Sequence, residues 1–146
     1  MSLPAYTARV LPEWIDYNGH MSEAFYVLAF GFATTSAMDH LGMDEAYRDN
    51  QAASLYTVEA HVRYLLEAGL DDDLEITTTI ASSGAKKLHL AHEMRTGGTL
   101  IATEEILGLH VDTASGSTSP FPEPVLAAIA AIGQQIPEWS GRSITA

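Results

Sequence analysis

The longest hydrophobic segment of the 146-residue chain predicts a buried helix from Ser22 to about His40. Its apolar residues recur on almost every side of a helical projection, which is typical of a helix that the rest of the protein encloses. Gly42 follows as a helix stop, and the polar segment 43–52 predicts a loop with a short helical turn at 44–48. The apolar positions are Phe25, Tyr26, Val27, Leu28, Ala29, Phe30, Phe32, Ala33, Ala37, Met38 and Leu41.

From residue 53 onward hydrophobic and polar residues alternate, and a period of two predicts strands. Strands are predicted at 53–68, 74–82, 86–96 and 99–112, after a short first strand at 5–12. Glycine and acidic turns separate the later strands at 71–73, 83–84 and 97–98. One face of the first long strand is expected to carry Tyr56, Val58, Ala60, Val62, Tyr64 and Leu66.

This order of elements predicts an α+β fold, in which an antiparallel sheet wraps one face around the long helix. After the last strand, a segment rich in serine, glycine and proline leads to a short helix from about Glu123 to Gln134 and a loose tail. The chain shows no internal repeat. Its length fits one domain spanning residues 1–146.

The composition narrows the classes of partner. Seven basic residues against 19 acidic ones give a formal net charge of −12, which argues against nucleic acid as a ligand. The absence of cysteine excludes disulfides, thiolate zinc sites and a cysteine nucleophile. No segment has the length of a membrane span, and Met1–Arg9 has no apolar signal region, so we expect no membrane partner and a cytoplasmic protein.

The histidines of the last two strands do not predict a metal site. His89 and His92 point to opposite faces of a strand, and their spacing toward Glu93 is not that of a zinc protease. Glu104 and Glu105 likewise lie on opposite faces of the final strand. The chain has neither a Gly-x-Ser-x-Gly motif nor a nucleotide-binding loop.

The segment from Trp14 to Tyr26 carries the candidate chemistry. It places Asp16 just before a helix start at which the side-chain oxygen of Ser22 is expected to accept from first-turn amides. A helix start also offers N–H groups and a positive dipole to an oxyanion. A carboxylate beside oxyanion donors is what acyl transfer requires. The alternative is purely local, because turns use Asp, Asn and Gly to shape the backbone.

The spacing of Asp16, Gly19-His20-Met21 and the aromatic Tyr26 resembles the helix entry of the hotdog acyl-CoA thioesterases, the 4-hydroxybenzoyl-CoA thioesterase-like superfamily. Segments 61–65, 110–112 and 120–122 are also similar, so the resemblance covers about residues 6–126. The sequence of residues 12–21 resembles that of the betainyl-CoA thioesterases of carnitine breakdown, including the thioesterase domain that is fused to carnitine dehydrogenase in some proteins.

This resemblance implies a hotdog fold and hydrolysis of a small acyl-CoA, most specifically betainyl-CoA, to glycine betaine and CoA. It implies no cofactor, because coenzyme A is part of the substrate. It also implies a homodimer or tetramer, with the active site at a subunit interface; pairing with a second copy would cover the free edge of a five-stranded sheet.

By the same resemblance, Asp16 is the candidate base or nucleophile, and Asn18, His20 and Glu23 are further candidate catalytic residues. A cation is attracted to aromatic faces, so the aromatic side chains near the motif, Phe25 among them, are candidates for holding a trimethylammonium group. Each is equally a candidate core residue. The predicted substrate-binding set is Trp14, Tyr17, Gly19, Met21, Tyr26 and Tyr56.

Two departures from the family pattern leave the chemistry open. Trp14 stands where many relatives carry a second acid, and Ser22-Glu23 stands where an Asn pair is usual. Asp16 therefore acts alone, or shares its role with Glu13 or Glu23, or the chain is a non-catalytic acyl-CoA or betaine-binding protein. The sequence contains no good match to the His and Asp pair of the hotdog dehydratases. The candidates for contact with the CoA phosphates are Arg63, Lys86, Lys87 and Arg95.

Overall fold

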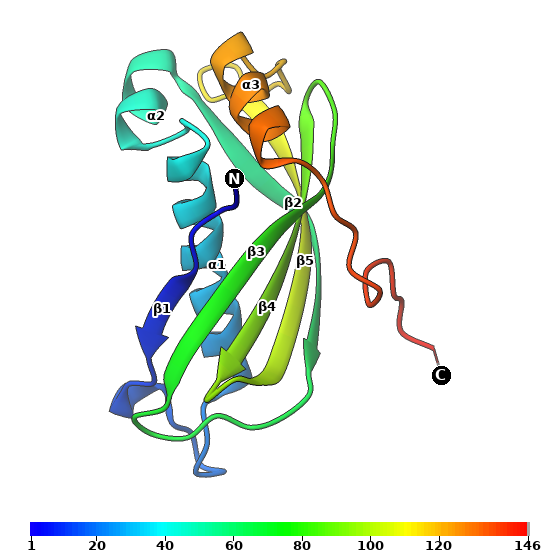
Figure 1. The fold of residues 1–146 in the computed structure, drawn as a ribbon. Coiled ribbons are helices and arrows are strands. Elements are labelled where there is room, and N and C mark those ends of the chain that lie inside the picture. Colours follow the sequence, from blue (N-terminus) through cyan, green and yellow to red (C-terminus); the bar gives the residue numbers. More distant parts are fainter. Residues whose placement is uncertain (146) are drawn as a thin grey trace.

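A curled antiparallel sheet of five strands holds the long helix α1 on its concave side (Figure 1). The computed structural model describes residues 1–145. The strands follow the order β1-β3-β4-β5-β2 across the sheet, and every neighbouring pair is antiparallel. The predicted α+β architecture is confirmed. The elements are β1 (Tyr6–Arg9), the 3-10 turn η1 (Pro12–Trp14), α1 (Glu23–His40), α2 (Glu45–Gln51), β2 (Ala53–Tyr64), β3 (Asp73–Ser83), β4 (Lys87–Thr96), β5 (Thr99–Asp112) and α3 (Glu123–Ile132).

The strand β2 departs from the simple alternation that its sequence predicts. Its pairing with β5 shifts register between Thr57 and Glu59, so Val58 is an extra residue that has no direct partner. A bulge of this kind twists a strand locally and re-aims the side chains on either side of it. The register places Tyr56 opposite Leu109 and Ala60 opposite Ile106, three positions apart on β5, so Tyr56 lies on the other face of the sheet from Ala60. The prediction of one continuous face along 53–68 is therefore wrong, because the bulge at Val58, which is 55% exposed, divides it.

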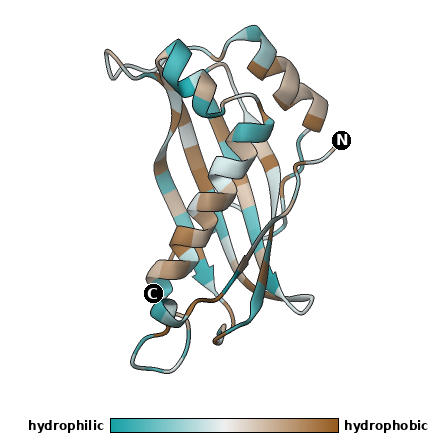
Figure 2. Cartoon of the chain, turned by 90° about the vertical axis from the view of Figure 1, so that its left-hand side faces the viewer, coloured by the Kyte–Doolittle hydropathy of each residue, from teal (hydrophilic) through white to brown (hydrophobic). Residues whose placement is uncertain are grey.

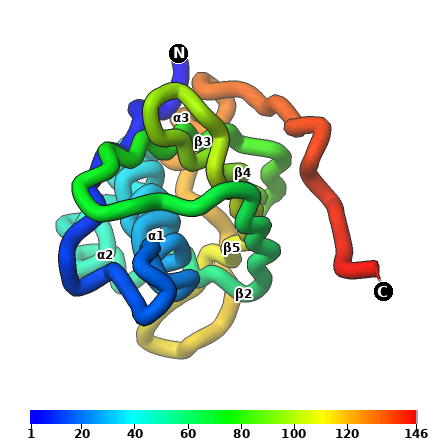
Figure 3. The backbone as a smooth tube through the Cα atoms, turned by 90° about the horizontal axis from the view of Figure 1, so that it is seen from below, coloured from blue at the N-terminus to red at the C-terminus, as the bar shows by residue number. Residues whose placement is uncertain are grey.

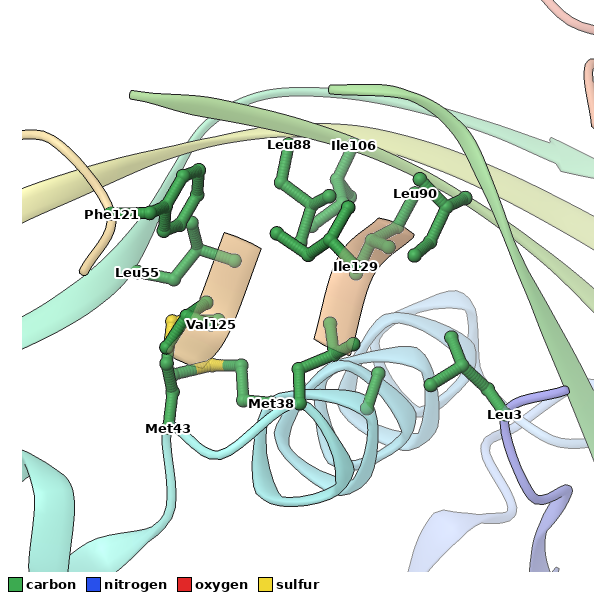
Figure 4. Close-up of a cluster of buried hydrophobic side chains, with 13 residues drawn as sticks. Leu3, Met38, Met43, Leu55, Leu88, Leu90, Ile106, Phe121, Val125 and Ile129 are labelled. Atoms are coloured by element: carbon green, nitrogen blue, oxygen red, sulfur yellow. The ribbon is translucent and has the colours of Figure 1, made fainter. Parts of the chain in front are cut away.

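The core contains two hydrophobic clusters with a polar layer between them. One cluster lies between the sheet and α3 and includes Leu88, Leu90, Ile106 and Ile129 (Figure 4). The other surrounds the first half of α1. Between them, each of the three central strands and α1 contributes one buried or half-buried polar residue at the same level. These four residues, Thr34, Thr78, His92 and Glu104, are called the polar layer below.

Helix α1 is less enclosed than its sequence predicts. Its buried face carries Tyr26, Phe30 and Ala33, but Val27, Leu28 and Phe32 on the outward side are exposed. Figure 2, which looks onto the helix from the side away from the sheet, shows hydrophobic residues along this outward face. The prediction of burial on all sides is wrong for a single chain. Across residues 1–145, no helix is long and apolar enough to cross a membrane.

The segment after α3 is not the loose tail that its composition suggests. It runs along the outside of the sheet, on the side away from α1 (Figure 3). The amide of Gln135 donates to the carbonyl of Ile80 (2.9 Å), and the indole of Trp139 donates to Glu93 (2.7 Å). The amide of Gly141 donates to Glu105 (2.7 Å). Residues 133–141 thus cover part of the convex face of the sheet.

Candidate active site

The predicted motif folds into a short loop that is closed on itself. The amide of Asp16 donates to the carbonyl of His20 (3.1 Å), and the amide of Gly19 donates back to the carbonyl of Asp16 (2.9 Å). Gly19 has a φ of +80°, a conformation that residues with a Cβ seldom adopt. The amide of Ser22 donates to the carbonyl of Trp14 (2.9 Å). These bonds tie Asp16 to the start of α1.

The carboxylate of Asp16 has both a local role and a free oxygen. Its Oδ1 accepts from the amide of Asn18 (2.8 Å), which is the turn-forming contact expected of an Asp before Asn-Gly. Within residues 1–145 we find no other donor to this half-buried group. One carboxylate oxygen therefore remains available to a water molecule or a substrate.

The start of α1 presents backbone donors without a side-chain cap. Ser22 occupies the cap position with extended backbone, but its side chain accepts no hydrogen bond, so that expectation is wrong. Its carbonyl accepts from the amide of Phe25 (3.0 Å). In the described chain the amides of Glu23 and Ala24 have no acceptor. They are the N–H groups that the positive end of the helix offers to an oxyanion.

The other predicted catalytic residues lie nearby but face solvent. His20 is 3.2 Å from Glu67, a partner that the sequence did not suggest because it lies beyond β2. Asn18 and Glu23 are exposed. The backbone carbonyl of Glu23 accepts from the hydroxyl of Tyr64 (3.3 Å).

A single chain does not gather the predicted aromatic residues into one cage. Trp14 is buried and stacks on Phe25, with ring centroids 5.6 Å apart. The buried Tyr26 accepts from the amide of Ala68 (3.1 Å). Tyr17 is 96% exposed, and Tyr56 is exposed on the free edge strand β2.

The segment that follows β2 holds two of the predicted binding residues, Met21 and Tyr26, by hydrogen bonds to its backbone. The amide of Met21 donates to the carbonyl of Ala68 (2.8 Å), and the Tyr26 hydroxyl donates to the carbonyl of Leu66 (3.2 Å). Tyr64 is an additional aromatic residue here, which the sequence pattern does not single out. It meets Tyr26 edge to face at 5.1 Å and lies beside the helix start.

Glu104 is a buried carboxyl group of β5 whose charge acts on the hydroxyl of Tyr64. The side chain is 4% exposed, and among residues 1–145 no donor bonds to it. Burial raises the pKa of Glu104 to about 7. Its oxygens still reach the surface, because no fully enclosed side-chain oxygen in the described chain lacks a hydrogen-bond partner. Glu105 lies on the opposite face, as predicted, and binds His89 (2.9 Å).

His110 and Arg95 have structural partners within the chain. Nδ1 of the buried His110 donates to the carbonyl of Ser119 (2.9 Å), and its Nε2 accepts from the Tyr47 hydroxyl (2.7 Å). Arg95, a candidate for phosphate contact, pairs with Glu93 (2.9 Å). Among residues 1–145, no three His, Asp or Glu side chains lie close enough together to hold a metal ion.

Comparison with known proteins gives consistent matches. Residues 10–129 match the family model described as the Thioesterase-like superfamily. A betainyl-CoA thioesterase from Pseudomonas aeruginosa is 37% identical, over 97% of this chain and 94% of that protein. An L-carnitine dehydrogenase/betainyl-CoA thioesterase from Rhizobium meliloti is 36% identical over 93% of this chain, which corresponds to 29% of the length of that longer protein.

A solved structure extends the match to the whole fold. A hypothetical protein from Staphylococcus aureus, determined in complex with CoA, superposes with a TM-score of 0.91. It is 30% identical, and the alignment covers 100% of this chain and 98% of the other.

Proposed function

Because the chain belongs to the thioesterase-like superfamily, we propose that it is a hotdog thioester hydrolase that converts betainyl-CoA to glycine betaine and free CoA. The observation that carries the acyl specificity is the 37% identity to a betainyl-CoA thioesterase over nearly the full length of both proteins. As part of this proposal the enzyme works in the cytoplasm and takes no cofactor, since water is the only co-reactant.

The loop geometry supports a role for Asp16 in the reaction. Its unpaired oxygen accepts a proton from a water molecule that attacks the thioester carbonyl, or it attacks that carbon itself and the acyl group is then hydrolysed. The carbonyl oxygen becomes an oxyanion, and the amides of Glu23 and Ala24 stabilise it. The C–S bond then breaks. If Asp16 acts as base, the leaving thiolate of CoA takes up the proton that Asp16 accepted. If Asp16 acts as nucleophile, the thiolate leaves an acyl-Asp16 anhydride, and the water that hydrolyses this anhydride supplies the proton.

The proposal includes a homodimer formed along β2. This strand is at the edge of the sheet, and Tyr56 and Val58 are exposed along it. Beside it, Val27 and Leu28 of α1 add further exposed apolar surface. Free strand edges and contiguous apolar surfaces of this kind are the features that a second copy covers. Such pairing would bring a second chain next to the Asp16 loop.

The first test is thiol release from betainyl-CoA, compared with acetyl-CoA and a medium-chain acyl-CoA. We expect betainyl-CoA to be the preferred substrate, and Asp16→Asn to lower kcat by about 100-fold or more, because an amide neither accepts the proton nor attacks the carbonyl.

Asp112→Asn is the matched control, because Oδ1 of Asp112 accepts from the amide of Ala114 (2.9 Å) in a turn of the same type. Its activity should remain within about twofold of wild type. Release from other thioesters only would remove the betaine specificity. If no thioester released CoA, a binding protein without catalysis would be the better description.

A further inference from the structure

Glu104 has no counter-charge inside the protein. It lies opposite His92 of β4 and Val62 of β2 in the register of the sheet. Both ring nitrogens of His92 are already engaged, by Thr34 (2.9 Å) and by Thr78 (2.8 Å). Burial is the only cause of the raised pKa of Glu104, and no basic side chain offsets it. A buried carboxylate without a partner is costly and calls for an explanation.

The flank of α1 above Glu104 is open. Glu23 contacts Tyr64 of β2, and Thr34, three turns later, contacts His92 of β4. Strand β5 lies between β2 and β4 in the sheet. The row of α1 residues that runs from Glu23 to Thr34 therefore passes over β5 between these two contacts. This row includes the exposed Val27 and also Gly31, where an added Cβ would meet nothing within 4 Å.

The groups around Glu104 come from three elements. Glu23 and Tyr26 belong to α1, Tyr64 to β2 and His92 to β4. Burial and then the charges of Glu23 and Glu104 raise the pKa of Tyr64, so the two carboxyl groups and this ring share one region. Tyr26 holds the ring of Tyr64 edge to face, and Tyr64 itself remains 46% exposed.

We propose, resting on the function proposed above, that Glu104 and Tyr64 form the subsite that receives the trimethylammonium group of the substrate. The cation supplies the counter-charge that Glu104 lacks, and its methyl groups pack on the face of Tyr64. The open space at the exposed Gly31 would leave room for the acyl group. An uncharged group of the same shape gains the packing but leaves the carboxylate unpaired.

The test compares betainyl-CoA with 3,3-dimethylbutanoyl-CoA, in which carbon replaces the cationic nitrogen. We expect wild type to favour the cationic thioester in kcat/KM, and Glu104→Gln to reduce that ratio at least about tenfold. The loss should fall on betainyl-CoA, while hydrolysis of the neutral thioester stays the same or improves. Tyr64→Leu should reduce the ratio and Tyr64→Phe should retain it, which separates loss of the ring from loss of the fold.

Glu105→Gln is the matched control, because it removes the neighbouring carboxylate on the opposite face of β5. Its ratio should equal that of wild type. A cationic preference that survives Glu104→Gln overturns the inference and leaves the proposed function intact. A wild-type enzyme that cleaves both thioesters equally well overturns the subsite together with the betaine specificity.

A second readout uses glycine betaine alone as the ligand. A bound cation favours the ionised carboxyl group, so binding near pH 7 should release a fraction of a proton per site. Calorimetry in buffers of different ionisation enthalpy measures this release. Glu104→Gln should abolish it, and equal proton release in wild type and variant would contradict the inference.

Discussion

At the scale of single residues, Glu104 and His92 stand opposite each other, and burial moves their pKa values in opposite directions. Burial lowers the pKa of His92 from 6.5 to about 4, so the folded protein keeps the ring neutral. The resulting stability is present above pH 6.5 and is lost as the pH falls toward 4. Burial raises the pKa of Glu104 from 4.5 to about 7, so its contribution is present below pH 4.5 and is lost as the pH rises through 7.

These two contributions should offset each other between about pH 4.5 and 6.5, and Glu104→Gln should separate them. Each contribution is on the order of 3 kcal/mol at 1.4 kcal/mol per unit of pKa. The free energy of unfolding of the variant, minus that of wild type, should therefore rise as the pH increases from 4.5 to 8. Urea unfolding at fixed protein concentration measures this difference. A difference that stays constant with pH would mean that Glu104 is not buried in solution.

The candidate site could be predicted from the sequence only where it is local. The Asp16 turn depends on neighbouring residues and is present as predicted, and the structure adds its contact to the amide of Asn18. Trp14 and Tyr26 are buried, and sequence alone does not distinguish a core aromatic residue from one that binds a ligand. Tyr64 was missed because its contact with Glu23 joins residues 41 positions apart.

At the scale of elements, helix and strand boundaries follow from periodicity, and departures arise where tertiary contacts decide. The turn at Gly97-Gly98 was correctly predicted, and both glycines have positive φ. The bulge at Val58 was not, because a strand sequence does not specify how its partner is aligned. The composition of the tail predicts a loose segment, but the N–H groups of Trp139 and Gly141 donate to carboxylates on the convex face.

If the tail contributes to stability in this way, Trp139→Ala should lower the free energy of unfolding by about 1–3 kcal/mol, through lost packing and a lost charge-assisted hydrogen bond. Glu93 keeps its second partner Arg95, which limits the cost. Denaturant unfolding measures the change. Ile136→Ala in the same tail should have an effect within about 0.5 kcal/mol, because Ile136 is exposed. Equal losses in both variants would refute the specific role of Trp139.

At the scale of the whole molecule, several of the exposed apolar residues lie on two elements, α1 and β2. Val27 and Leu28 are on α1, and Tyr56 and Val58 are on the edge strand β2. A formal net charge of −12 would otherwise keep copies apart in solution. The uncharged surface on α1 and β2 is where the proposed pairing would avoid this repulsion.

Val58→Asp should therefore convert the protein to a monomer and lower thioesterase activity at least about tenfold, because a buried unpaired charge at such an interface costs several kcal/mol. Light scattering after size-exclusion chromatography gives the mass. Thr7→Asp, on β1 at the other edge of the sheet, should leave both mass and activity unchanged. A fully active Val58→Asp monomer would show that one chain completes the site.

The hydrogen bond between Thr34 and His92 fixes the position of α1 along its own axis. Thr34 lies 11 residues after the helix start, roughly 16 Å away at 1.5 Å per residue. A slide of one turn, about 5.4 Å, would place an apolar side chain against His92 and strand its ring nitrogen. The bond to His92 thus helps to set where the amides of Glu23 and Ala24 lie along the helix axis. A substitution of His92 should lower kcat although His92 does not contact the substrate, because the amides of Glu23 and Ala24 would no longer be held in place relative to Asp16.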